Sequence, residues 1–220
     1  MKAELIALIA AVRYILLSNS RWMSWNLFLA FVPLALSAWL FRRKRSRSLL
    51  WWVGFLVFFA FLPNAPYVLT DVIHLITEIR IVNSVWIITL LLIPVYLLYI
   101  LAGFEAYVLS LINLGYYLNR LGQGRGILAA EVIAHILSSV GIYLGRFLRF
   151  NSWDLITEPD ALATRVVENL VGKRPLVIIA VTFVVVAGLY WIMKRVTLAI
   201  IQRRRNYYIL INNQDKLPKD

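Results

Sequence analysis

Six apolar runs, each near the length that crosses a bilayer, limit what this chain can fold into. A helix needs about 20 apolar residues to cross the ~30 Å hydrocarbon core. The runs cover residues 3–18, 24–41, 49–69, 85–107, 127–148 and 176–193. Composition agrees, because 61% of the 220 residues are hydrophobic and 15% are charged, whereas soluble domains are roughly 45–50% apolar. We therefore predict an all-α polytopic transmembrane helix bundle of about six spans.

The first run is the shortest, and it contains Arg13. A cleaved signal peptide is disfavoured, because Glu4 lies in the region that would have to be basic and no small-residue cleavage pattern follows. We expect a retained span at 3–18, and a helix lying on the membrane surface is the alternative. The predicted domains are a transmembrane bundle over residues 1–200 and a basic cytoplasmic tail over 201–220.

Basic residues exceed acidic residues by 23 to 11, and their placement decides what the excess means. They flank the apolar runs in short groups, as in membrane topology signals, so nucleic-acid binding is excluded as the main interpretation. The distribution predicts six spans with the N- and C-termini in the cytoplasm. Anionic lipid headgroups are candidate partners of one basic loop and of the tail, although a topology signal without lipid recognition is the simpler and favoured interpretation. The residues concerned are Arg42, Arg43, Lys44, Arg45, Arg203, Arg204 and Arg205.

The third run contains the segment "FLPNAPYVLTDVIHLITE", which places two prolines inside a predicted span. Residues 49–62 would cover only about 21 Å as a helix and need a continuation to complete the span. Pro63 and Pro66 lack a backbone donor and disfavour helical geometry just before them, so we predict a break between Leu62 and Tyr67. Asn64 is placed to cap a new helix or to satisfy freed backbone groups.

Asp71, His74 and Glu78 follow at spacings of three and four, which puts three titratable side chains on one face of a helix near the outer boundary. Such spacing suits metal ligands, a proton relay or a network with a partner helix. The simpler interpretation is an interfacial helix whose polar face meets water.

The end of the fifth run supplies potential partners for that acidic face. Gly141 and Gly145 form a small-xxx-small pattern typical of close helix packing. Arg146 and Arg149 emerge at the outer boundary beyond them, and we expect them to pair with the acidic face. Asn151 and Asp154 complete this predicted outer cluster, although arginines that only extend toward the membrane surface are the alternative.

A second predicted cluster lies toward the inner side. Glu131 and His135 are one turn apart within the fifth run, and Glu105 is expected at similar depth in the fourth. An ionisable residue inside a span is a functional-site hypothesis by default. The alternative is an interhelical hydrogen-bond pair that locks the bundle.

Two stretches, "LPNAPYVLTDVIHL" and "GIYLGRFLRFNSWD", resemble the signature segments of an uncharacterised bacterial membrane-protein family, the domain-of-unknown-function family numbered 1361. The likeness extends over most of the chain except the tail. It implies a polytopic protein of the bacterial plasma membrane, and it supplies no activity, cofactor or catalytic residue. A thylakoid membrane obeys the same charge rules and stays an alternative.

Three classes of function remain open from the residues. A binding, transport or complex-assembly role is favoured, because a broken helix beside ionisable groups is typical of substrate paths, with homo- or hetero-oligomers as an alternative to a monomer. A membrane-embedded metal-dependent hydrolase would use a divalent metal to activate water. It is less favoured, because the chain has only two histidines and no cysteine, and His74 and His135 are expected more than ~10 Å apart. The third class is a purely structural subunit of a membrane complex. No cofactor, metal ligand or catalytic residue is assigned, and an enzyme is not the favoured class.

Overall fold

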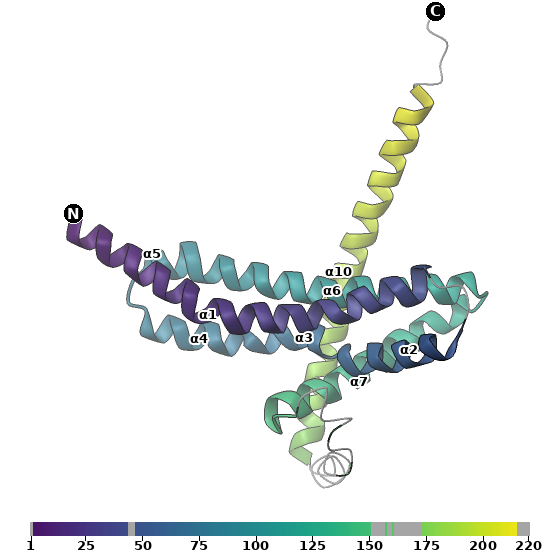
Figure 1. The fold of residues 1–220 in the computed structure, drawn as a ribbon, viewed down its shortest axis with the longest axis horizontal. Coiled ribbons are helices and arrows are strands. Elements are labelled where there is room, and N and C mark those ends of the chain that lie inside the picture. Colours follow the sequence, from purple (N-terminus) through teal and green to yellow (C-terminus); the bar gives the residue numbers. More distant parts are fainter. Residues whose placement is uncertain (1, 44–46, 151–156, 158–159, 161–172, 215–220) are drawn as a thin grey trace, which may run out of the picture.

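The computed structural model describes residues 2–43, 47–150, 157, 160 and 173–214, which form helices and no strand (Figure 1). The first two helices are α1 (Lys2–Ser37) and α2 (Leu49–Phe61), with the π-helix η1 (Ala38–Arg43) at the end of α1. Next come α3 (Asn64–Tyr67), the 3-10 helix η2 (Val68–Asp71), α4 (Val72–Ile81), α5 (Val85–Ile87) and the π-helix η3 (Ile88–Leu92). The remaining elements are α6 (Ile93–Arg120), η4 (Gly124–Gly126), α7 (Ile127–Phe147) and α10 (Lys173–Gln214).

Five helical stretches of the described chain are long and apolar enough to cross a membrane, which confirms the predicted helical membrane protein. They are Asn19–Arg43, Leu49–Ile81, Val85–Arg120, Gly124–Phe147 and Lys173–Tyr207. The expected division of the N-terminal region into two spans was wrong, because 3–18 and 24–41 both belong to the uninterrupted helix α1 and its end. The residues between the two runs, "NSRWM", contain neither Pro nor Gly, so nothing in the local sequence stops the helix.

The predicted break in the third span is confirmed. Helix α2 ends at Phe61, and helix α3 begins at Asn64 between the two prolines. The side-chain amide of Asn64 donates to the backbone oxygen of Phe61 at 3.0 Å, so it satisfies a carbonyl freed by the break rather than capping α3. The chain then stays helical through η2 and α4, so the interrupted stretch still makes one long span (Figure 1).

The π-helix η3 also has a cause in the sequence. Pro94 lies two residues after its end and has no N–H to offer the carbonyl of Leu90, which would be its partner in an α-helix. Widening to a π-turn is one way in which a helix accommodates such a mismatch.

Helix α6 is the centre of the fold. It packs against α1, α3, η2, α7 and α10. Its buried face repeats every three or four residues, as a helix requires. The members on this face are Tyr96, Tyr99, Gly103, Tyr107, Ser110, Leu114 and Tyr117.

Glycines bring the interrupted third span into close contact with its neighbours. A Cβ at Gly141 of α7 would lie 2.6 Å from the Cβ of Pro63, and a Cβ at Gly103 of α6 would lie 2.8 Å from Val68 Cγ2. Gly145 follows one turn later and faces the ring of Tyr67. The small-residue face of α7 therefore packs on Pro63 and on Tyr67 of α3, which places α3 between α6 and α7.

Helix α10 crosses the other helices and extends beyond them (Figure 1). It is continuous through residues 200 and 201, so no change of structure marks the predicted start of a tail. The assignment of residues 201–220 to a separate cytoplasmic tail stays a prediction.

Candidate functional site

The carboxylate of Asp71 lies at the centre of a polar cluster between four parts of the bundle. Asp71 is 1% exposed although it lies within a span. Its Oδ2 accepts hydrogen bonds from the hydroxyl of Tyr99 at 2.6 Å and from the amide of Asn26 at 3.1 Å. We call Asn26, Asp71, His74, Tyr99 and Arg146 the Asp71 cluster, to which α1, η2, α4, α6 and α7 each contribute one residue.

The second oxygen of this carboxylate has a different environment. Its cationic or imidazole neighbours are Arg146 Nη1 at 3.8 Å and His74 Nε2 at 3.9 Å, and both distances exceed hydrogen-bond length. Arg146 instead donates through Nη2 to the backbone oxygen of Thr70 at 3.3 Å. Within the described part of the chain, Oδ1 therefore accepts no hydrogen bond, and two groups that can donate stand beside it.

His74 connects the cluster to the surface. Its side chain is 47% exposed, and its ring lies 4.7 Å from the ring of Trp22 on α1. Trp22 also packs edge-on to Tyr99 at 5.8 Å. The side of the carboxylate that carries Oδ1 is thus bordered by an exposed imidazole and an aromatic wall.

Other members of the predicted outer cluster lie elsewhere. Glu78 is half-buried and forms no ion pair within the described residues. The expected pairing of Arg149 was not found there either: its side chain is exposed, and its backbone is left-handed with φ 59°. This left-handed residue lies two positions beyond the end of α7. Asn151 and Asp154 lie outside the described residues.

A second buried cluster joins α6, α7 and α10. Glu131 Oε1 accepts from the hydroxyl of Tyr190 at 2.7 Å and forms a salt bridge with Lys194. The hydroxyl of Tyr107 lies 2.7 Å from His135 Nδ1, and the rings of His135 and Tyr190 are 4.7 Å apart. These five residues form the Glu131 cluster, which attaches α10 to the bundle.

Glu105 was expected beside Glu131 and His135. Among the described residues, it forms no hydrogen bond or ion pair with either of them. Its Oε1 accepts from the hydroxyl of Thr197 at 2.7 Å. Thr197 lies one turn beyond Lys194, so Glu105 bonds to the same face of α10 at another level.

The two predicted histidines belong to separate clusters. Along α7, Arg146 of the Asp71 cluster is 11 residues from His135, which is about 16 Å at 1.5 Å per residue. No group of three or more His, Asp or Glu side chains that would suit a metal ion occurs in the described ranges.

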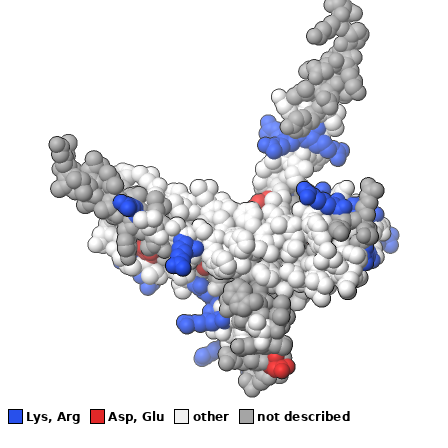
Figure 2. Space-filling model, in the orientation of Figure 1, with Lys and Arg blue, Asp and Glu red and all other residues white. Residues whose placement is uncertain are grey.

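The residues proposed to bind lipid headgroups differ in their side-chain contacts and exposure. Arg42 Nε donates to Asn113 Oδ1 at 2.8 Å, and its guanidinium lies 4.3 Å from the centre of the Tyr116 ring. Arg43 and the run from Arg203 to Arg205 are exposed, while Lys44 and Arg45 lie outside the described residues. Blue surface gathers on the C-terminal part of α10 and at the end of the bundle where α1 meets α2 (Figure 2).

Sequence reasoning missed the partners that complete both clusters. Tyr99 and Tyr107 carried a usable signal, because they share a face of α6 with Tyr96 and Tyr117 at helical spacing. Asn26 and Lys194 gave a weaker signal, since each lies near other polar or charged residues at one end of an apolar run.

The comparisons with known proteins agree with the signature segments. Residues 25–187 match the model of the family "Protein of unknown function (DUF1361)". This range contains the interrupted third span, both polar clusters except Lys194 and Tyr190, and the glycine face of α7. No curated protein and no solved structure matches the chain. Since the match covers more than half of its length, the chain belongs to the DUF1361 family.

Proposed function

We propose that this chain is a binding protein of the membrane, in the class that includes transport and complex assembly, and that it recognises a polar ligand at the Asp71 cluster. The observation that carries the proposal is the unequal use of the Asp71 carboxylate. Oδ2 accepts two hydrogen bonds, whereas Oδ1 accepts none from the described residues. A ligand with a hydroxyl or ammonium group would supply the donor that Oδ1 lacks.

The surroundings of Oδ1 support this choice of ligand. A buried carboxylate without enough hydrogen bonds is costly, and the cost falls when a ligand donor arrives. Arg146 is 22% exposed at its side chain and His74 is 47% exposed, so the approach to Oδ1 is bordered by groups that reach the surface. The guanidinium next to the carboxylate also suits a ligand that carries an acceptor near its donor.

We further propose a bacterial plasma-membrane location with a cytoplasmic C-terminus. Arg42 and Arg43 at the end of η1, Arg120 and Arg125 between α6 and α7, and the arginines of α10 would share the cytoplasmic side. Because α1 is continuous, its N-terminal end would then face the opposite side, in contrast to the expectation from six spans.

The test compares small molecules that remain bound to the purified full chain. The protein would be extracted into lipid nanodiscs, and bound molecules would be identified by mass spectrometry for the wild type, Asp71→Asn and Glu78→Gln. Asn keeps the shape and one acceptor for Tyr99 but removes the charge. Since a hydrogen bond to a charged group contributes about 1.5–3 kcal/mol, the ligand should be reduced at least about tenfold in Asp71→Asn.

Glu78→Gln is the matched control, because it removes a half-buried carboxylate that forms no described ion pair. It should retain the ligand at the wild-type level. The same molecules at the same amounts in wild type and Asp71→Asn, or no retained polar molecule in the wild type, would contradict the proposal.

A further inference from the structure

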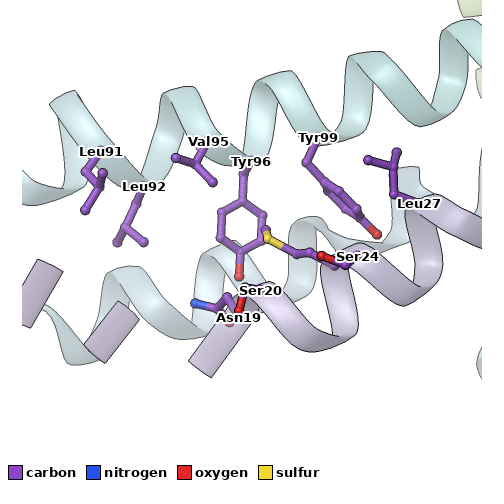
Figure 3. Close-up of a pocket in the computed structure, with 10 residues that line it drawn as sticks. Asn19, Ser20, Ser24, Leu27, Leu91, Leu92, Val95, Tyr96 and Tyr99 are labelled. Carbon is purple, nitrogen blue, oxygen red and sulfur yellow. The ribbon is translucent and has the colours of Figure 1, made fainter. Parts of the chain in front are cut away.

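A cavity of about 220 Å³ lies between α1 and the start of α6, beside the Asp71 cluster but not including Asp71 (Figure 3). The helix α1 contributes Asn19, Ser20, Met23, Ser24 and Leu27 to its wall. The other wall is formed by Leu91, Leu92, Val95, Tyr96 and Tyr99. An apolar cavity of ~150 Å³ is enough to bind benzene, so this space admits a ring or a short chain.

Two polar atoms at the cavity have no hydrogen-bond partner among the described residues: the amide nitrogen of Asn19 and the hydroxyl of Tyr96. Both residues are more than nine-tenths buried, at 8% and 1% exposed. In Figure 3 the Tyr96 hydroxyl points across the cavity toward Asn19 and Ser20 on α1. A buried polar atom without a partner costs free energy, so these atoms indicate a missing group.

The orientation of the Asn19 amide follows from its neighbour. The indole N–H of Trp22 donates to Asn19 Oδ1 at 3.0 Å. Because an indole N–H can only donate, the oxygen must face Trp22 and the NH₂ group must be the free end. The missing group must therefore accept from Asn19, and it can exchange a hydrogen bond with Tyr96.

The rest of the wall fixes the character of the molecule. None of the residues that line the cavity is charged, and most of the lining is aliphatic or aromatic. Leu91 and Leu92 belong to the π-helix η3, a distortion that is frequent at functional sites. Ser20 and Ser24 are small, which leaves space on α1 where larger side chains would close the cavity.

We infer that this cavity binds an uncharged, membrane-soluble molecule that has an apolar body and one hydroxyl or carbonyl oxygen, with the oxygen held by Asn19 and Tyr96. This site is separate from the one proposed at Asp71 Oδ1, although Tyr99 contributes to the walls of both. The occupant is a free amphiphile rather than a phospholipid of the bilayer, because no cation lines the cavity to meet a phosphate.

The experiment uses the full chain in nanodiscs of dialkyl-ether phospholipids, which have no ester carbonyl. The probes are a decanol and a decane that each carry a photoreactive diazirine at the same carbon near the chain end. After irradiation, the labelled peptides are mapped by mass spectrometry. The alcohol should label residues 19–27 and 91–99 at least threefold more than the hydrocarbon. In Tyr96→Phe this preference should fall at least about threefold, toward equal labelling by the two probes, as expected for the loss of one neutral hydrogen bond.

Two further variants keep the result interpretable. Tyr116→Phe removes an exposed hydroxyl from the same helix and should leave labelling unchanged. Ser24→Leu fills the cavity from an exposed position of α1 and should reduce labelling by both probes. Equal labelling by alcohol and hydrocarbon, or wild-type preference in Tyr96→Phe, would overturn the inference.

A last arm separates a free amphiphile from a bilayer lipid. Labelling would be repeated in nanodiscs of diacyl phospholipids, whose ester carbonyls offer the same acceptor. Unchanged labelling supports a free amphiphile, whereas a severalfold decrease would assign the cavity to a lipid ester and overturn the inference. Asp71→Asn should keep the alcohol preference, so failure at Asp71 and failure at this cavity are distinguishable.

Discussion

Replacement of Lys194 by Met should lower the free energy of unfolding by about 3 kcal/mol, because it leaves the Glu131 carboxylate buried without its cation. The side chain of Glu131 is only 10% exposed, and Tyr190 is the other described donor to it. Met has nearly the length of Lys, so packing against α7 is kept while the charge is lost. Unfolding in mixed detergent micelles, followed by tryptophan fluorescence, measures the effect.

A second substitution separates the ion pair from packing. In the double variant Glu131→Leu with Lys194→Met, both charges are gone, and most of the lost stability should return, since an apolar pair is often as stable as a buried ion pair. Lys173→Met is the matched control, because Lys173 is exposed at the start of the same helix. If the single variant and this control lose the same stability, the Glu131–Lys194 pair does not hold α10 in place.

Gly141→Ala is the second large change that we expect. The new methyl group would lie 2.6 Å from Pro63 Cβ and 2.7 Å from Pro63 Cγ, well inside contact distance. Because the proline ring is rigid and belongs to the break in the third span, α7 must move away, at a cost of about 1–3 kcal/mol. The same shift should move Arg146 away from Asp71, so thermal unfolding temperature and ligand retention should both fall.

The control for this prediction is Gly188→Ala in α10, where an added Cβ meets no atom within 4 Å. There the substitution should be neutral or stabilise the helix by about 0.5–1 kcal/mol, because Gly is a poor helix former. Equal stability of Gly141→Ala and Gly188→Ala would show that α7 and the Pro63 turn do not pack as described.

The break in the third span was predictable, because proline imposes it locally. Pro63 and Pro66 lack a backbone donor in any surroundings, and the interruption between Phe61 and Asn64 lies at the N-terminal edge of the predicted interval from Leu62 to Tyr67. The approach of Arg146 to Asp71 was also within reach, since both lie at the same end of their spans. The position of Arg149 could not be predicted, because a left-handed backbone at a non-glycine residue has no marker in the sequence.

The features that the sequence did not predict depend on contacts between segments that are distant in the chain. The N-terminal region contains two apolar runs separated by polar residues, which suggested a loop, but Asn19 bonds Trp22 three residues on and the helix continues. In the same way, Asn26 and Tyr99 become partners of Asp71 only when α1 and α6 pack around η2. Helical period shows which face is buried, but it does not show which helix covers it.

The length of α10 has a mechanical consequence. From Lys194 to Gln214 the helix continues for 20 residues, about 30 Å at 1.5 Å per residue. The Glu131–Lys194 pair and the Glu105–Thr197 hydrogen bond attach this helix to the bundle near the start of that stretch, so a tilt of about 10° there would displace the far tip by about 5 Å. A change in packing among the side chains of the Glu131 cluster would thus be amplified into a larger movement of the arginines at positions 203–205.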